Sequence, residues 1–234
     1  PAVYSGEPVM PWLVLEGQRL WAEQGPCAAL VGPLSYSAFI TGMLRQGYRS
    51  VYAALRHVLA VSGERGYEPE TSQARFMFAN NAGHWFEPLE DCVQQLQRAR
   101  EGTVQGGDLQ NAGSTYVTIS IPLLDCAPTL EMCAAETEAG LAFAARTGNG
   151  QIANRLIIFQ QFVRALRGET EALGNSTDGS SDDAARLASL GASPVANAGF
   201  HVSRALVAAI LADTVGLARH AAAAMPFLPH IESL

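Results

Sequence analysis

Apolar side chains recur at steps of three and four between residues 130 and 168, where the repeating unit of the chain is clearest. The first stripe consists of mostly small side chains: Leu130, Cys133, Thr137, Leu141 and Ala144. This spacing predicts a helix that ends near Gly148, because glycine readily adopts a positive φ. Asn149 can cap a second helix, whose stripe consists of Ile152, Leu156, Phe159, Val163 and Leu166. The segment therefore predicts a helical hairpin.

The same periodicity predicts further helices, separated by Gly and Pro, at residues 7–24, 27–45, 48–61, 70–84, from Pro88 onward, from Asp108 onward, at 195–211 and after 213–216. Pro122 is expected to kink or end the helix that Asp108 caps. The turns Gly107-Asp108 and Gly148-Asn149 lie 41 residues apart, a period that helix-turn-helix solenoids tolerate. The pattern predicts an all-α, right-handed α-solenoid of about ten helices in tetratricopeptide-like hairpins.

The stretch from 169 to 192 differs from the rest, because it is polar, acidic and rich in Gly and Ser. It is expected to be a flexible loop with at most a short helix at 182–190. With this loop included, residues 1–234 are interpreted as a single helical-repeat domain. The chain begins with Pro1 instead of Met, which suggests a piece excised from a longer protein or a processed chain.

Composition excludes several classes of function. The formal charge is -7, whereas binding of nucleic-acid phosphates needs clustered cations. All 15 basic residues are Arg, and without Lys there is no Walker-type P-loop, no protein-kinase nucleotide lysine and no Schiff-base catalyst. No cofactor or metal site is expected, because the spacing of Cys and His matches no zinc motif. The four cysteines are interpreted as buried small hydrophobic residues: Cys27, Cys92, Cys126 and Cys133. No apolar run is long enough for a membrane span, so a soluble, cytoplasmic protein is expected.

Several stretches, occurring in one order along the chain, resemble a known family. They are ARFMFANNAGHWFEPLEDCVQQLQRARE, GGDLQNAG, GLAFAARTGN, RALRGET and SPVANAGFHVSRALVAAILADTVGLARHAAAAMP. They resemble the tetratricopeptide-like helical region of very large bacterial signalling proteins. In that family a serine/threonine-kinase-like domain and an AAA-type ATPase module precede the helices, and a sensor histidine kinase or another output domain follows. The resemblance covers residues 36–231 and implies a middle segment without the catalytic domains.

Two groups of residues are candidates for contacts with a ligand or partner. His84 and Trp85 can line a pocket for planar or cationic groups, or they can plug a hairpin end while His84 caps carbonyl groups. Arg155, Arg164 and Arg167 lie along one predicted helix and can hold an anionic partner. Alternatively they lie on a solvated face, where Arg164 and Arg167 of the last turn pair with the helix dipole. Phe159 and Phe162 are the other candidates for lining a ligand site.

No residues are assigned to catalysis. His201 and Ser203 are two apart and cannot share a helical face, and His220 is expected at the surface. We therefore expect a non-catalytic regulatory scaffold that binds a protein segment or neighbouring domains of its own polypeptide, and so couples an ATPase or kinase-like module to an output domain. The alternative is a sensor module that binds a small molecule near Trp85, Phe159 and Phe162. An enzyme would need an acid and a base that the sequence does not reveal.

Overall fold

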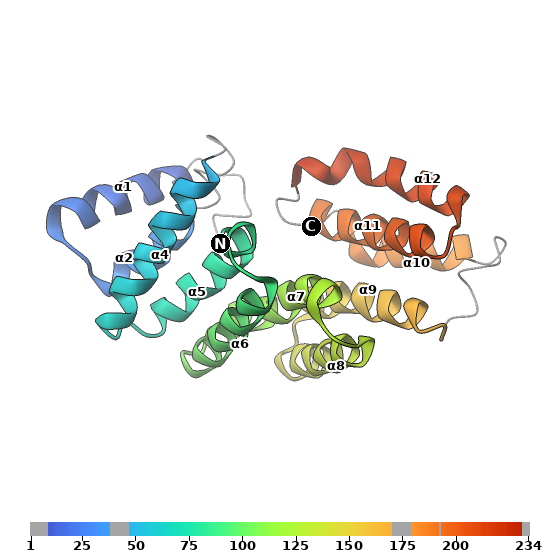
Figure 1. Ribbon diagram of the computed structural model, residues 1–234, viewed down its shortest axis with the longest axis horizontal. Coiled ribbons are helices and arrows are strands. Elements are labelled where there is room, and N and C mark those ends of the chain that lie inside the picture. Colours follow the sequence, from blue (N-terminus) through green and yellow to red (C-terminus); the bar gives the residue numbers. More distant parts are fainter. Residues whose placement is uncertain (1–8, 38–46, 170–178, 192, 231–234) are drawn as a thin grey trace. The chain divides into compact units, whose positions relative to one another are not determined.

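The computed structural model describes residues 9–37, 47–169, 179–191 and 193–230, and every regular element in these ranges is a helix (Figure 1). The all-α class is therefore confirmed for this part of the chain. The chain divides into two compact units, Pro1–Pro122 and Leu123–Leu234. Each is described separately below.

The first unit contains most of its helices in the predicted places. They are α1 (Val9–Gln24), α2 (Ala28–Ser35), α4 (Tyr48–Glu64), α5 (Glu70–Asn81), the short 3-10 helix η3 (Gly83–Trp85) and α6 (Leu89–Gln105). α7 (Leu109–Cys126) begins here and crosses the boundary between the units. The prediction that Pro122 could end this helix is wrong, since α7 continues for four residues beyond it. The part of the predicted helix 27–45 that follows Ser37 lies outside the described residues.

α5 is the central helix of the first unit, because it packs against α2, α4 and α6. Its buried side chains lie all around the helix instead of forming one stripe: Thr71, Ser72, Ala74, Phe76, Met77, Phe78 and Ala79. Two small apolar clusters join it to its neighbours. In one, Phe78 packs with Val51 and Leu55 of α4; in the other, Ala74 packs with Val31 and Val58.

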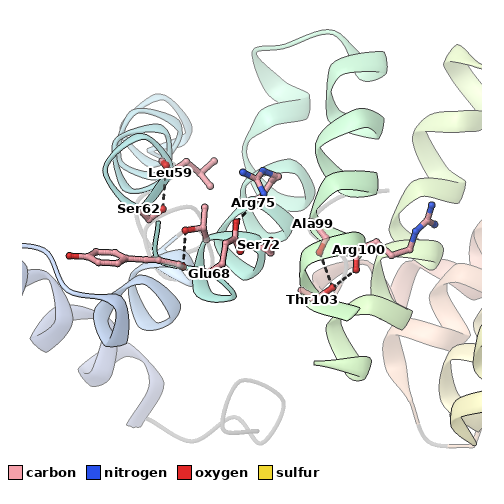
Figure 2. A network of polar contacts seen from close by, with 10 residues as sticks. Leu59, Ser62, Glu68, Ser72, Arg75, Ala99, Arg100 and Thr103 are labelled. Atoms are coloured by element: carbon pink, nitrogen blue, oxygen red, sulfur yellow. Dashed lines mark hydrogen bonds and ion pairs between the residues drawn. The ribbon is translucent and has the colours of Figure 1, made fainter. Parts of the chain in front are cut away.

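A polar network holds the start of α5 (Figure 2). Pro69, at the N-cap position, makes no capping hydrogen bond through its side chain. Glu68 takes over this role, because its Oε2 accepts hydrogen bonds from the backbone N of Ser72 at 3.1 Å and from Ser72 Oγ at 2.8 Å. The other carboxylate oxygen of Glu68 lies 3.8 Å from Arg75. The first turn of α5 thus receives a hydrogen-bond acceptor and a negative charge, both of which stabilise a helix N-terminus.

Two glycines, Gly102 near the end of α6 and Gly106 at its C-cap, allow this helix to approach the start of α5 closely. A Cβ atom at Gly102 would lie 2.8 Å from Ser72 Cβ, and one at Gly106 would lie 2.8 Å from Pro69 Cγ. Such separations are too short for real carbon atoms. The spacing of four residues places both glycines on one face of α6, so α5 lies against backbone there.

The second unit contains α8 (Leu130–Thr147), α9 (Gly150–Leu166), α10 (Gly179–Leu190), α11 (Pro194–Ile210), α12 (Thr214–Ala224) and the 3-10 helix η5 (Met225–His230). The predicted hairpin at 130–168 is confirmed as α8 and α9. Gly148 has a φ of 66°, and the side chain of Asn149 accepts a hydrogen bond from the backbone N of Ile152 at 3.1 Å. Ile152, Leu156 and Val163 of the predicted stripe of α9 are buried, whereas Phe159 and Leu166 are half-buried. Ile158 and Phe162 are buried as well, so the buried face is wider than one stripe.

Residues 169–192 contain more helix than expected. α10 covers residues 179–190, three residues more than the short helix predicted at 182–190, while residues 170–178 and 192 lie outside the described residues. Leu190 of α10 packs with Ile158, Ala196 and Phe200 in a buried cluster. Packing against α11 therefore supports a helix that the polar composition of this stretch does not favour.

We expect Gly102→Ala and Gly106→Ala each to lower the free energy of unfolding by about 1–3 kcal/mol, because the added methyl group overlaps the start of α5. Urea denaturation followed by circular dichroism measures this change. Gly63→Ala is the matched control, since a methyl group there meets nothing within 4 Å and α4 gains up to about 1 kcal/mol of helix propensity. Equal effects of all three substitutions would contradict the close approach.

Candidate functional site: an exposed aromatic surface

Two segments of the first unit bring aromatic side chains together. Tyr48 and Tyr52 lie one turn apart on α4 and therefore share a face. Trp85 ends η3, and Phe86 follows it. We call these four residues the aromatic surface. Gly83 is buried at the start of η3, where a Cβ atom would lie 3.2 Å from both Cys92 Sγ and Phe78 Cε1, so glycine allows this turn to lie close to α5 and α6.

The rings of the two segments contact one another in pairs. Tyr48 and Trp85 have ring centroids 5.3 Å apart, and Tyr52 and Phe86 have centroids 4.7 Å apart, both in tilted geometry. Tyr52 also lies 5.6 Å from the ring of Phe78, which is 3% exposed and belongs to the core. These separations fall in the range favoured by aromatic pairs. The core of the unit therefore holds the aromatic surface in place from below.

The outer side of the aromatic surface is open to solvent. The exposed fractions are 46% for Tyr48, 53% for Trp85 and 39% for Phe86. Single exposed apolar residues are ordinary, but exposed rings that contact one another in pairs present a larger apolar area, and such areas mark surfaces that bind partners. Tyr and Trp are also enriched among the residues that dominate binding energy.

Charged side chains border the aromatic surface. The guanidinium of Arg49 lies 5.6 Å from the centroid of the Phe86 ring, and that of Arg56 lies 5.6 Å from the Tyr52 ring. The Tyr52 hydroxyl donates a hydrogen bond to Glu87 Oε1 at 2.8 Å and accepts one from Arg56 Nη1 at 3.1 Å. Arg56 and Glu87 are 4.0 Å apart. The border therefore contains two cations and one anion.

His84 lies beneath Trp85, with ring centroids 4.9 Å apart. Burial lowers the pKa of this imidazole, and a hydrogen bond to the Ala79 backbone opposes the shift only in part. Its Nε2 is buried and has no hydrogen-bond partner within the described residues. The predicted role of His84 in capping a helix end agrees with the bond to Ala79. Trp85 is 53% exposed, so only part of its side chain can fill the hairpin end.

The remaining candidate residues all lie on α9, in the second unit. Phe162 is buried and lines a narrow hollow with Phe200 and Arg204. Phe159 and Arg155 are half-buried, and Arg164 is exposed, with its Nε 3.8 Å from Glu169. The ion pair of Arg164 agrees with the interpretation of a solvated helix end.

Sequence reasoning missed a polar cluster between α10, α11 and α12. The expectation that His220 lies at the surface is wrong, since it is 6% exposed and its Nδ1 lies 3.1 Å from Nδ1 of His201. Asp183 of α10 lies 3.7 Å from Nε2 of His220 and 2.6 Å from Arg204. The sequence signal was one histidine on each of two consecutive helices. Their contact depends on how the helices pack, which periodicity does not specify.

The prediction that all four cysteines are buried is correct only in part. Cys92 and Cys133 are buried, whereas Cys126 is half-buried and Cys27 is exposed. No disulfide links the four. Within the described ranges, no three His, Cys, Asp or Glu side chains gather as a set of metal ligands. Among the helices described, none combines the length and apolar character needed to cross a membrane.

In the part of the chain that the structure describes, the protein is thus all-helical, with an exposed aromatic surface on its first unit. Comparison with protein-family models, with curated proteins and with solved structures found no match.

We expect Tyr52→Phe to lower the free energy of unfolding by about 0.5–1.5 kcal/mol, because it removes the hydroxyl that bonds Glu87 and Arg56 but keeps the ring contacts. Chemical denaturation measures the change. Glu87→Gln retains an acceptor oxygen for the hydroxyl and serves as the milder comparison. A Tyr52→Phe variant as stable as the unmodified protein would show that this hydrogen bond does not hold the aromatic surface.

Proposed function

We propose that this chain is a non-catalytic binding module, and that its aromatic surface holds a segment of another protein or of a neighbouring domain of its own polypeptide. The observation that carries the proposal is the pairing of Tyr48 with Trp85 and of Tyr52 with Phe86, while Tyr48, Trp85 and Phe86 remain 39% to 53% exposed. Interfaces are enriched in such amphipathic rings, which contribute large contact area at low entropic cost.

The charges beside the rings indicate the chemistry of the partner. Arg49 and Arg56 outnumber Glu87 at this border, although the chain as a whole has a formal charge of -7. A segment with an apolar or aromatic anchor and acidic flanking residues complements this arrangement. The anchor would lie on the rings and its carboxylates beside the two guanidinium groups.

The resemblance described above supports a role in bacterial signal transduction. In that arrangement the module would transmit the state of an ATPase or kinase-like domain to an output domain by binding a segment of one of them. The proposal concerns this chain alone, and catalysis would belong to the flanking domains.

The alternative function, a small-molecule sensor, has less support. The hollow beside Phe162 has a volume of only about 10 Å³, and it is lined by Ile158, Gln161, Phe200, Ser203, Arg204 and Val207. Pockets for drug-sized ligands measure roughly 300–1,000 Å³. The aromatic surface, in contrast, is open and suits an extended or helical segment.

We expect Trp85→Ala to weaken partner binding by about 30-fold or more, the effect of losing a central aromatic anchor. Its effect on stability should be small, because half of the side chain is already exposed. Trp12→Ala is the matched control, since Trp12 of α1 is 60% exposed in the same unit. The two variants are compared for capture of partners from a lysate of the organism that encodes the protein, and for capture of separately supplied flanking domains. Dissociation constants are then measured by calorimetry.

A partner captured by the unmodified protein and by Trp12→Ala, but lost with Trp85→Ala, would support the proposal. Equal capture by both variants would place binding elsewhere and overturn the role of the aromatic surface. If the unmodified protein captures nothing from either source, the binding function itself is contradicted.

A further inference from the structure

The packing of α12 against α11 contains two histidines in direct contact. Nδ1 of His201 on α11 lies 3.1 Å from Nδ1 of His220 on α12. Nε2 of His220 lies 3.2 Å from Nη2 of Arg219. The exposed fraction of the His220 side chain is 8%, so water cannot easily replace either contact.

These contacts define the protonation state of both rings. A guanidinium nitrogen only donates, so Nε2 of His220 must accept and carries no proton. A neutral His220 then carries its proton on Nδ1 and donates it to Nδ1 of His201. His201 in turn must accept on Nδ1, which leaves its own proton on Nε2. The arrangement is satisfied by two neutral imidazoles and by no other protonation state.

The surrounding groups make protonation unfavourable. Burial and the neighbouring cations Arg219 and Arg204 lower the pKa of His220 from 6.5 to about 4, against the opposing effect of Asp183. Burial also lowers the pKa of His201. Each neighbouring helix contributes to this environment. α10 supplies Asp183, which is also bound to Arg204 at 2.6 Å, and the side chains of α9 that line the adjoining hollow, Ile158, Gln161 and Phe162, are uncharged.

The pair also connects to other parts of the second unit. The ring of Phe200, buried in the core of α11, packs edge-on against both imidazoles. Phe227 of η5 stacks on His201 with an interplanar angle of 9°. Displacement of either imidazole would therefore disturb α12, η5 and the core together.

We propose that the His201–His220 pair is an acid-sensitive junction, in which both imidazoles must be neutral for α12 and η5 to remain packed on α11. A proton on His201 would place two N–H groups against each other. An N–H group at Nε2 of His220 would face the N–H groups of the Arg219 guanidinium, and the imidazole would turn toward Asp183, 3.7 Å away. A proton on His201 therefore removes the hydrogen bond between the helices, whereas a proton on Nε2 of His220 removes the hydrogen bond with Arg219.

The direction of the pH effect follows from the lowered pKa values. A histidine freed by opening titrates near 6.5, whereas His220 in the packed state titrates near 4, so the open state binds more protons between these values. The packing is thus fully stable above pH 6.5 and weakens as the pH falls toward 4. At pH 5 the opening equilibrium of α12 should be about 30-fold more favourable than at pH 7.5.

Hydrogen exchange at pH 7.5 and pH 5.0, corrected for the intrinsic exchange rate, tests this proposal. We expect the protection factors of the α12 amides to fall about 30-fold between pH 7.5 and pH 5.0. The amides of α8 and α9, which lie in the same unit and contain no histidine, serve as the internal reference. Nitrogen NMR of the imidazoles identifies their tautomers in the same samples. Unchanged protection of α12 relative to α8 and α9, or a His220 ring that protonates near pH 6.5 without loss of packing, would overturn the proposal.

His220→Gln provides a variant in which protonation of His201 does not place two N–H groups against each other. A glutamine amide can donate to His201 and accept from Arg219, and it can reverse to accept from a protonated His201. We expect its α12 amides to show less than a third of the acid response. His57→Gln, an exposed histidine on α4, should leave the response unchanged. If His220→Gln responds to acid like the unmodified protein, the histidine pair does not cause the loss of protection, and the proposal is overturned. If this variant does not fold, hydrogen exchange and NMR of the unmodified protein test the proposal by themselves.

Discussion

The burial of α5 on nearly all sides is the constraint on which the first unit depends. α5 packs against three helices, and it can do so because Gly102 and Gly106 leave room on α6 while Glu68 caps its first turn. Phe78, near its C-terminal end, lies in the core and contacts Tyr52 from below. The aromatic surface is therefore positioned by the same helix that organises the apolar core of the unit.

The second unit uses polar groups where the first uses glycine. The contact between α11 and α12 contains two imidazoles, and the neighbouring α10 adds an aspartate bound to Arg204. Buried polar groups are stable only when every donor finds an acceptor, so this contact depends on a single protonation state. An apolar contact would hold over a wide pH range. The two units thus differ in the conditions under which their helices remain packed.

Local signals in the sequence determined the helices and many of their ends. Gly148 takes a positive φ, and Asn149, Asp108 and Ser193 accept hydrogen bonds from the first turns of the helices that follow them. Such caps involve residues within about four positions of one another, so a single sequence contains all the information they require.

Tertiary structure alone decided which side chains meet. Tyr48 and Trp85 are 37 positions apart, and His201 and His220 lie on different helices, so neither contact follows from a helical repeat. The sequence indicated His84 and Trp85 as candidates but placed His220 at the surface, because a histidine among alanines gives no sign of what packs above it. α10 formed in a stretch whose composition favours a loop, since the burial of Leu190 against Phe200 outweighs local preference. Periodicity specifies which face of a helix is apolar, and packing between helices decides what that face contacts.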